Sequence, residues 1–182
     1  MYSGEFERIG KRLFAEHLVG GNFGNMSVRT GDGFFIKRTG TCLDIATEPV
    51  FVPLSGDAPK EASSEYRVHR AVYSTTNHTA IVHAHPPYAV AASLVMDRII
   101  PEDSEGVMFC PLIPVVTGAP GTQEVADNVA CALSTTKLVI AQGHGTFAAG
   151  AILDDAYVLT SLAEHSCRIL ALKRQFRYGS FF

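Results

Sequence analysis

The sequence predicts an α/β fold in one domain over residues 1–182, with a sheet of mixed strand direction covered by helices. The chain has 182 residues, 47% of them hydrophobic and 18% charged, which is long and apolar enough for one hydrophobic core. Apolar runs of strand length alternate with helical patterns, but without the strict order of βαβ units, which favours mixed strand directions. No internal repeat, low-complexity segment or linker divides the chain.

The first third of the chain predicts one helix followed by short strands. Apolar residues at helical spacing, with charges between them, predict an amphipathic helix over residues 2–18. Two strands, at 26–29 and 34–37, are joined by Thr30-Gly31-Asp32-Gly33, which is a hairpin signal. Prolines and a glycine break the pattern that follows, so we expect loops there and one short strand at 50–54.

The middle of the chain predicts a helix, a buried strand and a second helix. Ser63 or Ser64 is a candidate N-cap for a helix that ends near Thr75. An apolar run at 79–83 predicts the buried strand. Pro86-Pro87 then opens the next helix, since proline fits a first helical turn.

The last part of the chain begins with a segment without a clear pattern, residues 97–106. Beyond it the periodicity predicts a strand at 112–116, a helix at 122–133, strands at 137–141 and 146–149, and a long final helix. Asp154 and Asp155 are placed to cap that helix, and its C-terminal turns are basic, the charge favoured at that end of a helix dipole.

Composition and charge exclude several classes of protein. The net charge is −3 and the basic residues are scattered, so no nucleic-acid surface is predicted. No apolar stretch approaches the roughly 18 residues that span a membrane, and residues 1–11 lack the apolar core of a signal peptide. The widely spaced cysteines predict free thiols in a reducing cytoplasm: Cys42, Cys110, Cys131 and Cys167. We therefore expect a cytoplasmic protein that binds neither nucleic acid nor membrane.

Histidines give the strongest chemical signal. In Val82-His83-Ala84-His85-Pro86 the two imidazoles point to the same side of a strand, with Cα atoms about 7 Å apart. Two rings so placed can hold one metal ion at roughly 2.0–2.1 Å, although ordinary strand-end histidines are an equal alternative. His144, flanked by two glycines directly after a predicted strand, is a candidate third ligand, and a solvated loop histidine is the alternative. Three histidines match an open zinc site, and nitrogen ligands also admit other divalent metals.

Glu65 and several small polar residues complete the candidate site. Taken locally, Glu65 is only a first-turn carboxylate of a capped helix. Beside a metal, however, a carboxylate is suited to proton transfer. Ser63 and Ser64 lie at the same predicted helix start, where backbone amides can bind an anion. Two glycine-containing segments, Gly24-Asn25-Met26-Ser27 and Thr39-Gly40, also allow backbone N–H groups to converge on an anion. The alternative is that each of these segments is an ordinary turn, because such sequences are common in turns.

Five motifs in register along nearly the whole chain resemble those of the class II aldolase/adducin family. They are Gly-Asn-x-Ser at 24–27, Thr-Gly at 39–40, Ser-Ser-Glu at 63–65, His-x-His-Pro-Pro at 83–87 and His-Gly at 144–145. The resemblance implies a mainly antiparallel mixed sheet with helices on both faces. It also implies assembly into homotetramers whose active sites lie between neighbouring subunits.

The same resemblance implies a reaction and a role for each motif. His83, His85 and His144 would bind zinc, and Glu65 would be the acid/base and an additional ligand in the empty site. The phosphate of the substrate would be held by Asn25, Thr39, Gly40, Ser63 and Ser64. The expected reaction is reversible cleavage of a ketose 1-phosphate, such as L-fuculose 1-phosphate, to dihydroxyacetone phosphate and an aldehyde such as lactaldehyde.

Two positions depart from the family pattern. A tyrosine that relatives carry before the Gly-Thr pair is absent, and Thr117 occupies the nearest position. Longer relatives also supply a tyrosine from a C-terminal tail, for which Tyr178 lies too early. The proton donor to the aldehyde oxygen is therefore unassigned. His69, four residues after Glu65, is either a partner of that carboxylate on the same helix face or a core histidine.

Three other functions occur in proteins related to this family. Pentulose-phosphate 4-epimerases share the retro-aldol chemistry but typically have aspartate at the position of Glu65, which favours the aldolase. Methylthioribulose-phosphate dehydratases share the metal site and eliminate water. Adducin-like interaction modules keep the fold and have lost the metal ligands, whereas this chain retains three histidines and the glutamate.

Overall fold

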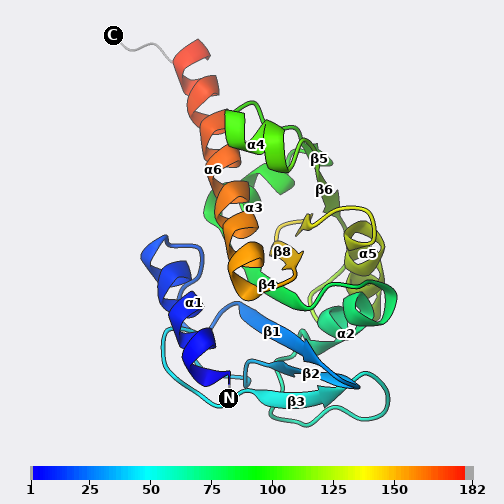
Figure 1. The fold of residues 1–182 in the computed structure, drawn as a ribbon. Coiled ribbons are helices and arrows are strands. Elements are labelled where there is room, and N and C mark those ends of the chain that lie inside the picture. Colours follow the sequence, from blue (N-terminus) through cyan, green and yellow to red (C-terminus); the bar gives the residue numbers. More distant parts are fainter. Residues whose placement is uncertain (1, 179–182) are drawn as a thin grey trace.

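The computed structural model describes residues 2–178, without the side chain of Tyr178 (Figure 1). Within these residues the chain forms six helices and eight strands. In chain order they are α1 (Ser3–Ala15), β1 (Asn25–Thr30), β2 (Gly33–Ile36), β3 (Val50–Pro53), α2 (Tyr66–Thr75), β4 (Ala80–Ala84), α3 (Pro87–Ser93), β5 (Arg98–Ile99), α4 (Ser104–Phe109), β6 (Ile113–Val116), α5 (Gln123–Leu133), β7 (Leu138–Ala141), β8 (Gly145–Gly150) and α6 (Leu153–Tyr178).

All eight strands belong to one open sheet with the order β3-β2-β1-β4-β8-β7-β6-β5. Every neighbouring pair is antiparallel except β6 and β7, which run parallel. The prediction of a mixed, mainly antiparallel sheet is therefore confirmed. At the centre of the sheet, His83 on β4 lies opposite Asn25 on β1 and opposite Phe147 on β8.

Helices cover both faces of the sheet, as predicted (Figure 1). Because side chains alternate along a strand, neighbouring residues of β4 enter different cores: Val82 packs with α1, α3 and α6, and Ile81 packs with α2 and α5. His83 follows Val82 and so faces the side of α2 and α5. The first histidine of the predicted site is thus fixed by a strand whose five residues are all buried.

Most predicted elements lie within a few residues of the observed ones, and the hairpin of β1 and β2 is confirmed. Residues 97–106, for which no element was predicted, contain β5 and the start of α4. A strand of two residues and a helix of six are too short to show a period.

The predicted caps were partly wrong. Neither Ser63 nor Ser64 caps α2, because the helix begins at Tyr66 and Glu65 occupies the N-cap position without a side-chain cap. Ser63 is held instead by backbone bonds to Lys37 and Tyr66, which delay the start of the helix. At α6 the Asp155 carboxylate accepts the N–H groups of Ala151 and Ile152 from within the first turn.

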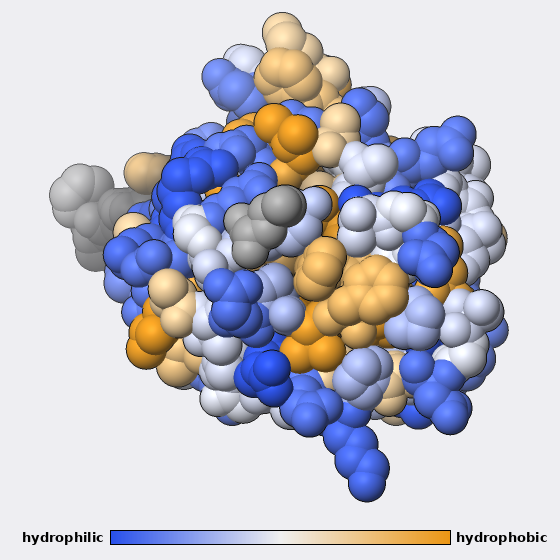
Figure 2. Space-filling view, turned by 60° about the horizontal axis from the view of Figure 1, so that its bottom comes forward, coloured by the Kyte–Doolittle hydropathy of each residue, from blue (hydrophilic) through white to orange (hydrophobic). Residues whose placement is uncertain are grey.

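The structure also describes the cysteines, the hydropathy of the helices and one face of the surface. The four cysteines are free thiols. Among the described residues, no helix combines the length and the hydropathy needed to cross a membrane. On the side of β2 and β3 that Figure 2 brings forward, a band of apolar side chains lies between hydrophilic ones.

Candidate active site

The site begins with His83, at the end of β4. Its ring stacks on Phe147 at 4.1 Å between centroids and is almost fully buried. Its Nδ1 lies 2.9 Å from the backbone oxygen of Thr146. Because a carbonyl only accepts hydrogen bonds, Nδ1 carries the proton, and the lone pair of Nε2 is left for a ligand.

His85 lies one residue beyond the strand, on the same side as His83. Its backbone N–H donates to the oxygen of Leu18 at 2.9 Å, which holds this residue after regular pairing has ended. Its Nε2 is 3.0 Å from Nε2 of His83, and the ring of Phe23 stacks on its face at 5.7 Å. The alternation predicted from the His-x-His spacing is therefore present.

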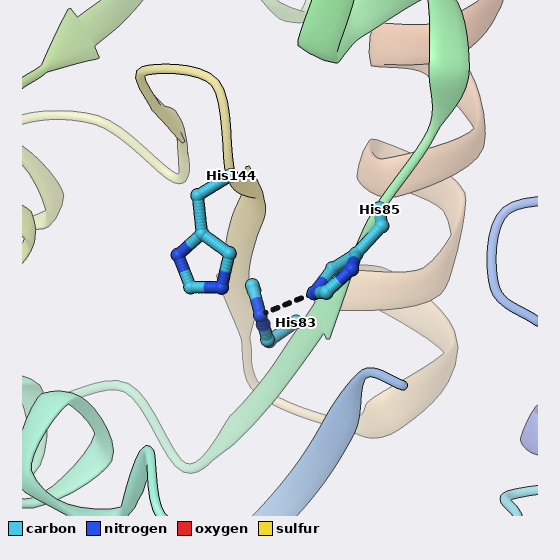
Figure 3. Close-up of side chains that lie close together, drawn as sticks. All are labelled: His83, His85 and His144. Carbon is cyan, nitrogen blue, oxygen red and sulfur yellow. Dashed lines mark hydrogen bonds between the residues drawn. The ribbon is translucent and has the colours of Figure 1, made fainter. Parts of the chain in front are cut away.

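His144 reaches the pair from the turn between β7 and β8. Gly143 has a φ of +65°, a conformation that favours glycine. Gly145, the first residue of β8, allows β8 to lie close to the end of β4. A Cβ at Gly145 would lie 2.2 Å from the backbone oxygen of Ala84 and 2.9 Å from the His85 ring. Glycines on both sides thus allow His144 to approach the other two rings. Figure 3 shows the three histidine rings close together.

The three histidines fit a divalent metal ion. One nitrogen from each ring lies within 4.8 Å of the others, and the 3.0 Å between two of them is close to the roughly 3.3 Å expected for two nitrogen ligands of one tetrahedral ion. Burial lowers the pKa of all three rings, that of His85 to about 4, so at neutral pH they are the neutral imidazoles that metals bind.

Glu65 lines the same cavity from the start of α2. The residue is only 7% exposed, and its Oε2 has no hydrogen-bond partner. Burial raises the pKa of the carboxyl group, while the backbone N–H of Gly121 acts in the opposite direction. Sequence reasoning did not identify Gly121, which lies in the loop between β6 and α5. Thr117, in the same loop, does not line the cavity.

The candidate phosphate-binding residues converge because two distant segments pair. Arg38 and Ala62 form an isolated antiparallel bridge, and Thr39 N–H donates to the oxygen of Glu61 at 2.8 Å. A cavity of about 230 Å³ therefore brings together all of the predicted site residues: Asn25, Thr39, Gly40, Ser63, Ser64, Glu65, His83, His85 and His144. Oδ1 of Asn25, like Glu65 Oε2, is buried without a partner.

Lys37 is a further cavity residue that sequence reasoning missed. Its buried ammonium group donates to the backbone oxygens of Asn22 at 2.6 Å and Gly24 at 3.0 Å, which fixes the glycine-rich loop before Asn25. Burial lowers its pKa to about 8. The available signal was a lysine at the end of an apolar strand, which alone does not distinguish a cavity residue from an exposed one.

The remaining histidines do not belong to the site. His69 is fully buried between the rings of Phe34 and Phe147, and its Nδ1 lies 2.6 Å from the hydroxyl of Ser27. Among the described residues no hydrogen bond joins the side chains of His69 and Glu65, which fits the core-histidine alternative. His78 is bonded to the oxygen of Leu133, and His17 and His165 are exposed.

The chain is similar to known proteins of one family. The model of the class II aldolase and adducin N-terminal domain matches residues 5–171. An L-fuculose phosphate aldolase of Escherichia coli O6:H1 is 35% identical over 161 residues, covering 83% of this chain and 72% of its own.

Two solved structures extend the comparison. The L-fuculose-1-phosphate aldolase of Thermus thermophilus superposes with a TM-score of 0.94 at 37% identity, covering 97% of this chain and 96% of its own. YgbL of Klebsiella pneumoniae, described as a putative aldolase/epimerase/decarboxylase, has a TM-score of 0.85 at 27% identity, with 99% of this chain and 90% of its own covered.

Proposed function

This chain belongs to the class II aldolase and adducin family, and from that premise we propose that it acts, as one domain, as a zinc-dependent aldolase that cleaves L-fuculose 1-phosphate. The products would be dihydroxyacetone phosphate and lactaldehyde. The name of the Thermus thermophilus relative supports this substrate, and the length of that relative closely matches the length of this chain.

The observation that carries the proposal is the convergence of three neutral imidazoles and one buried carboxyl group in a single cavity. When bound by His83, His85 and His144, a divalent ion supplies Lewis-acid stabilisation of negative charge that develops on substrate oxygens. An interaction module without chemistry has no need of such a cluster. The retained ligand set therefore favours an enzyme over an adducin-like module.

Glu65 would transfer the proton. In the synthetic direction it takes a proton from the carbon of dihydroxyacetone phosphate, and in cleavage it returns one. Burial raises the pKa of this carboxyl group, which increases its protonated fraction near neutral pH and suits a group that must both give and take a proton.

The substrate phosphate would bind within the same cavity. The candidate donors are the side chains or backbone of Asn25, Thr39, Gly40, Ser63 and Ser64. The buried ammonium group of Lys37 adds positive charge to the lining of this cavity. Binding there would hold the reacting carbon against Glu65 and so lower the entropic part of the barrier.

We further propose a cytoplasmic homotetramer with active sites between subunits. Support comes from large apolar side chains that lie exposed near the end of α3, on α4 and around β5 and β6: Leu94, Val95, Met96, Ile100, Val107, Met108, Phe109 and Leu112. Exposed apolar surface of this extent is typical of protein interfaces. Light scattering of the purified protein would give the number of subunits.

An epimerase or dehydratase of phosphorylated pentuloses is the second candidate. It is supported by the similarity to YgbL, whose description includes an epimerase. Glu65, where epimerases have aspartate, favours the aldolase.

The test is cleavage of L-fuculose 1-phosphate, with enzymatic detection of dihydroxyacetone phosphate, in the presence and absence of a chelator. Metal-dependent release is expected. A metal-loaded protein that releases nothing, but converts a pentulose phosphate, would replace the aldolase with the second candidate.

A further inference from the structure

Helix α3 connects two of the three histidines. It begins two residues after His85, and its last residue, Ser93, contacts the turn that precedes His144. The two ligands come from distant parts of the sequence, and their separation decides whether one ion can contact both. The attachments of α3 therefore bear on the metal site.

Ser93 attaches the C-terminal end of the helix to the His144 turn. Its hydroxyl accepts the N–H of Gly143 at 2.9 Å and donates to the oxygen of Val90 at 2.7 Å. In the same place the amide of Gln142 donates to the Ser93 backbone oxygen at 3.2 Å. Ser93 is fully buried, so water does not compete for these bonds.

Glu164 attaches the N-terminal end of α3 to the long helix α6. The N-cap residue Pro86 makes no side-chain cap, so the first amide groups of the helix need another acceptor. Oε2 of Glu164 accepts the N–H groups of Tyr88 at 2.8 Å and Ala89 at 3.0 Å. A carboxylate at this end also complements the helix dipole. The helix start, and with it the backbone after His85, is thereby fixed against α6.

We propose that Ser93 and Glu164 are positioning residues of the metal site, which set the separation of His85 and His144 through the two ends of α3. The inference rests on the proposed metal-binding function of the three histidines. Outer residues that orient metal ligands commonly contribute about 10–100-fold in metal affinity. Neither residue lines the cavity itself, so neither contacts the substrate in this proposal.

The test measures Co²⁺ binding to the metal-free protein by visible absorption, which reports the ligand geometry independently of activity. Ser93→Ala is expected to weaken Co²⁺ binding about ten-fold and to change the absorption bands, because Gly143 N–H loses its acceptor. Thr160→Val is the matched control: Thr160 is a fully buried hydroxyl on α6 that donates to Ala156 at 2.9 Å and has no bond to the site. Its Co²⁺ affinity should stay at the wild-type value.

A second pair of variants keeps the test decisive where Ser93→Ala does not fold. Glu164→Ala removes the acceptor and should weaken Co²⁺ binding, whereas Glu164→Gln retains an acceptor oxygen and should restore it. Folded Ser93→Ala and Glu164→Ala proteins with wild-type affinity and spectrum would overturn the proposal, as would an equal loss in Thr160→Val. A wild-type protein that binds no Co²⁺ would instead remove the proposed metal function on which this inference rests.

Discussion

Two cavities lie at opposite ends of the central strands, and the smaller one contains the proposed active site. The larger, of about 960 Å³, is lined by residues before β4 and β7 and after β8. The smaller, of about 230 Å³, lies beyond the other end of β4 and at the start of β8. The proposed site is therefore not in the larger of the two cavities.

The difference between the cavities lies in how their polar groups are used. In the larger cavity His78 bonds to Leu133, Asp155 bonds to the amides before α6, and Asp154 pairs with Arg8 of α1. These side chains join elements of the fold. In the smaller cavity two oxygen atoms, Oδ1 of Asn25 and Oε2 of Glu65, are buried without hydrogen-bond partners. Buried polar atoms are nearly always hydrogen-bonded, so these unpaired atoms are consistent with a site that binds a ligand.

The largest effect is expected from removing a ligand in the smaller cavity. His144→Ala should abolish metal retention and lower aldolase activity about 10³-fold, since Lewis-acid stabilisation contributes several kcal/mol to a barrier. Metal content and release of dihydroxyacetone phosphate measure both, and circular dichroism should show a folded protein. A fully loaded and active variant would show that the ligand assignment is wrong.

Glu65→Gln separates proton transfer from metal binding within the same cavity. The substitution keeps the shape of the side chain and removes the exchangeable proton, so activity should fall about 10²–10³-fold. The three histidines remain, so the variant should still bind a metal ion even though it loses the additional carboxylate ligand expected in the empty site. Unchanged turnover would assign the acid/base role to another group.

The pH dependence of stability tests the effect of burying His69. The pKa of His69 is lowered by burial to about 3, so on acidification the unfolded chain takes up its proton first, below pH of about 6.5. The contribution of neutral, buried His69 to the free energy of unfolding is fully present above a pH of about 6.5 and is lost as the pH falls toward about 3. At pH 4 His69 alone should remove about 3 kcal/mol from the free energy of unfolding.

Denaturant titrations of the metal-free protein at several pH values measure this loss. The control is His69→Gln, which has no ionisable ring and should show a shallower dependence on pH. A dependence as steep as that of the wild type would assign the effect to other groups.

The smallest effect on function is expected in the larger cavity. Asp155→Ala removes the acceptor for the amides before α6 and should cost about 1 kcal/mol of stability. Activity should stay within about two-fold of wild type, because no part of the proposed site is involved. A large loss of turnover with unchanged stability would give this cavity a role in the reaction.

Much of the site could be predicted because its strongest signals are local. A strand alternates its side chains, so His83 and His85 were expected to share a face, and the bond from His85 N–H to the Leu18 oxygen keeps this arrangement one residue beyond β4. His144 could be named from its glycines and the preceding strand, but its distance from the other two depends on the β4–β8 register. The fold was predictable for a similar reason, since its longer elements show clear periods.

The residues that were missed depend on contacts between distant segments. Lys37 is a cavity residue because its ammonium group turns back to the loop at Asn22, and no local pattern predicts that bond. Gly121 approaches Glu65 only because α2 and α5 pack side by side on one face of the sheet. The expected serine caps were wrong because Ser63 is bonded to the segment at Lys37.

Titration of the metal-free protein with Zn²⁺, followed by cleavage of L-fuculose 1-phosphate at each step, tests the central claim most directly. We expect release of dihydroxyacetone phosphate to rise with added Zn²⁺ and to level off at one ion per chain, while His144→Ala shows no rise. Full release from the chelated wild-type protein, unaffected by Zn²⁺, would contradict the assignment of a metal-dependent aldolase to this cavity.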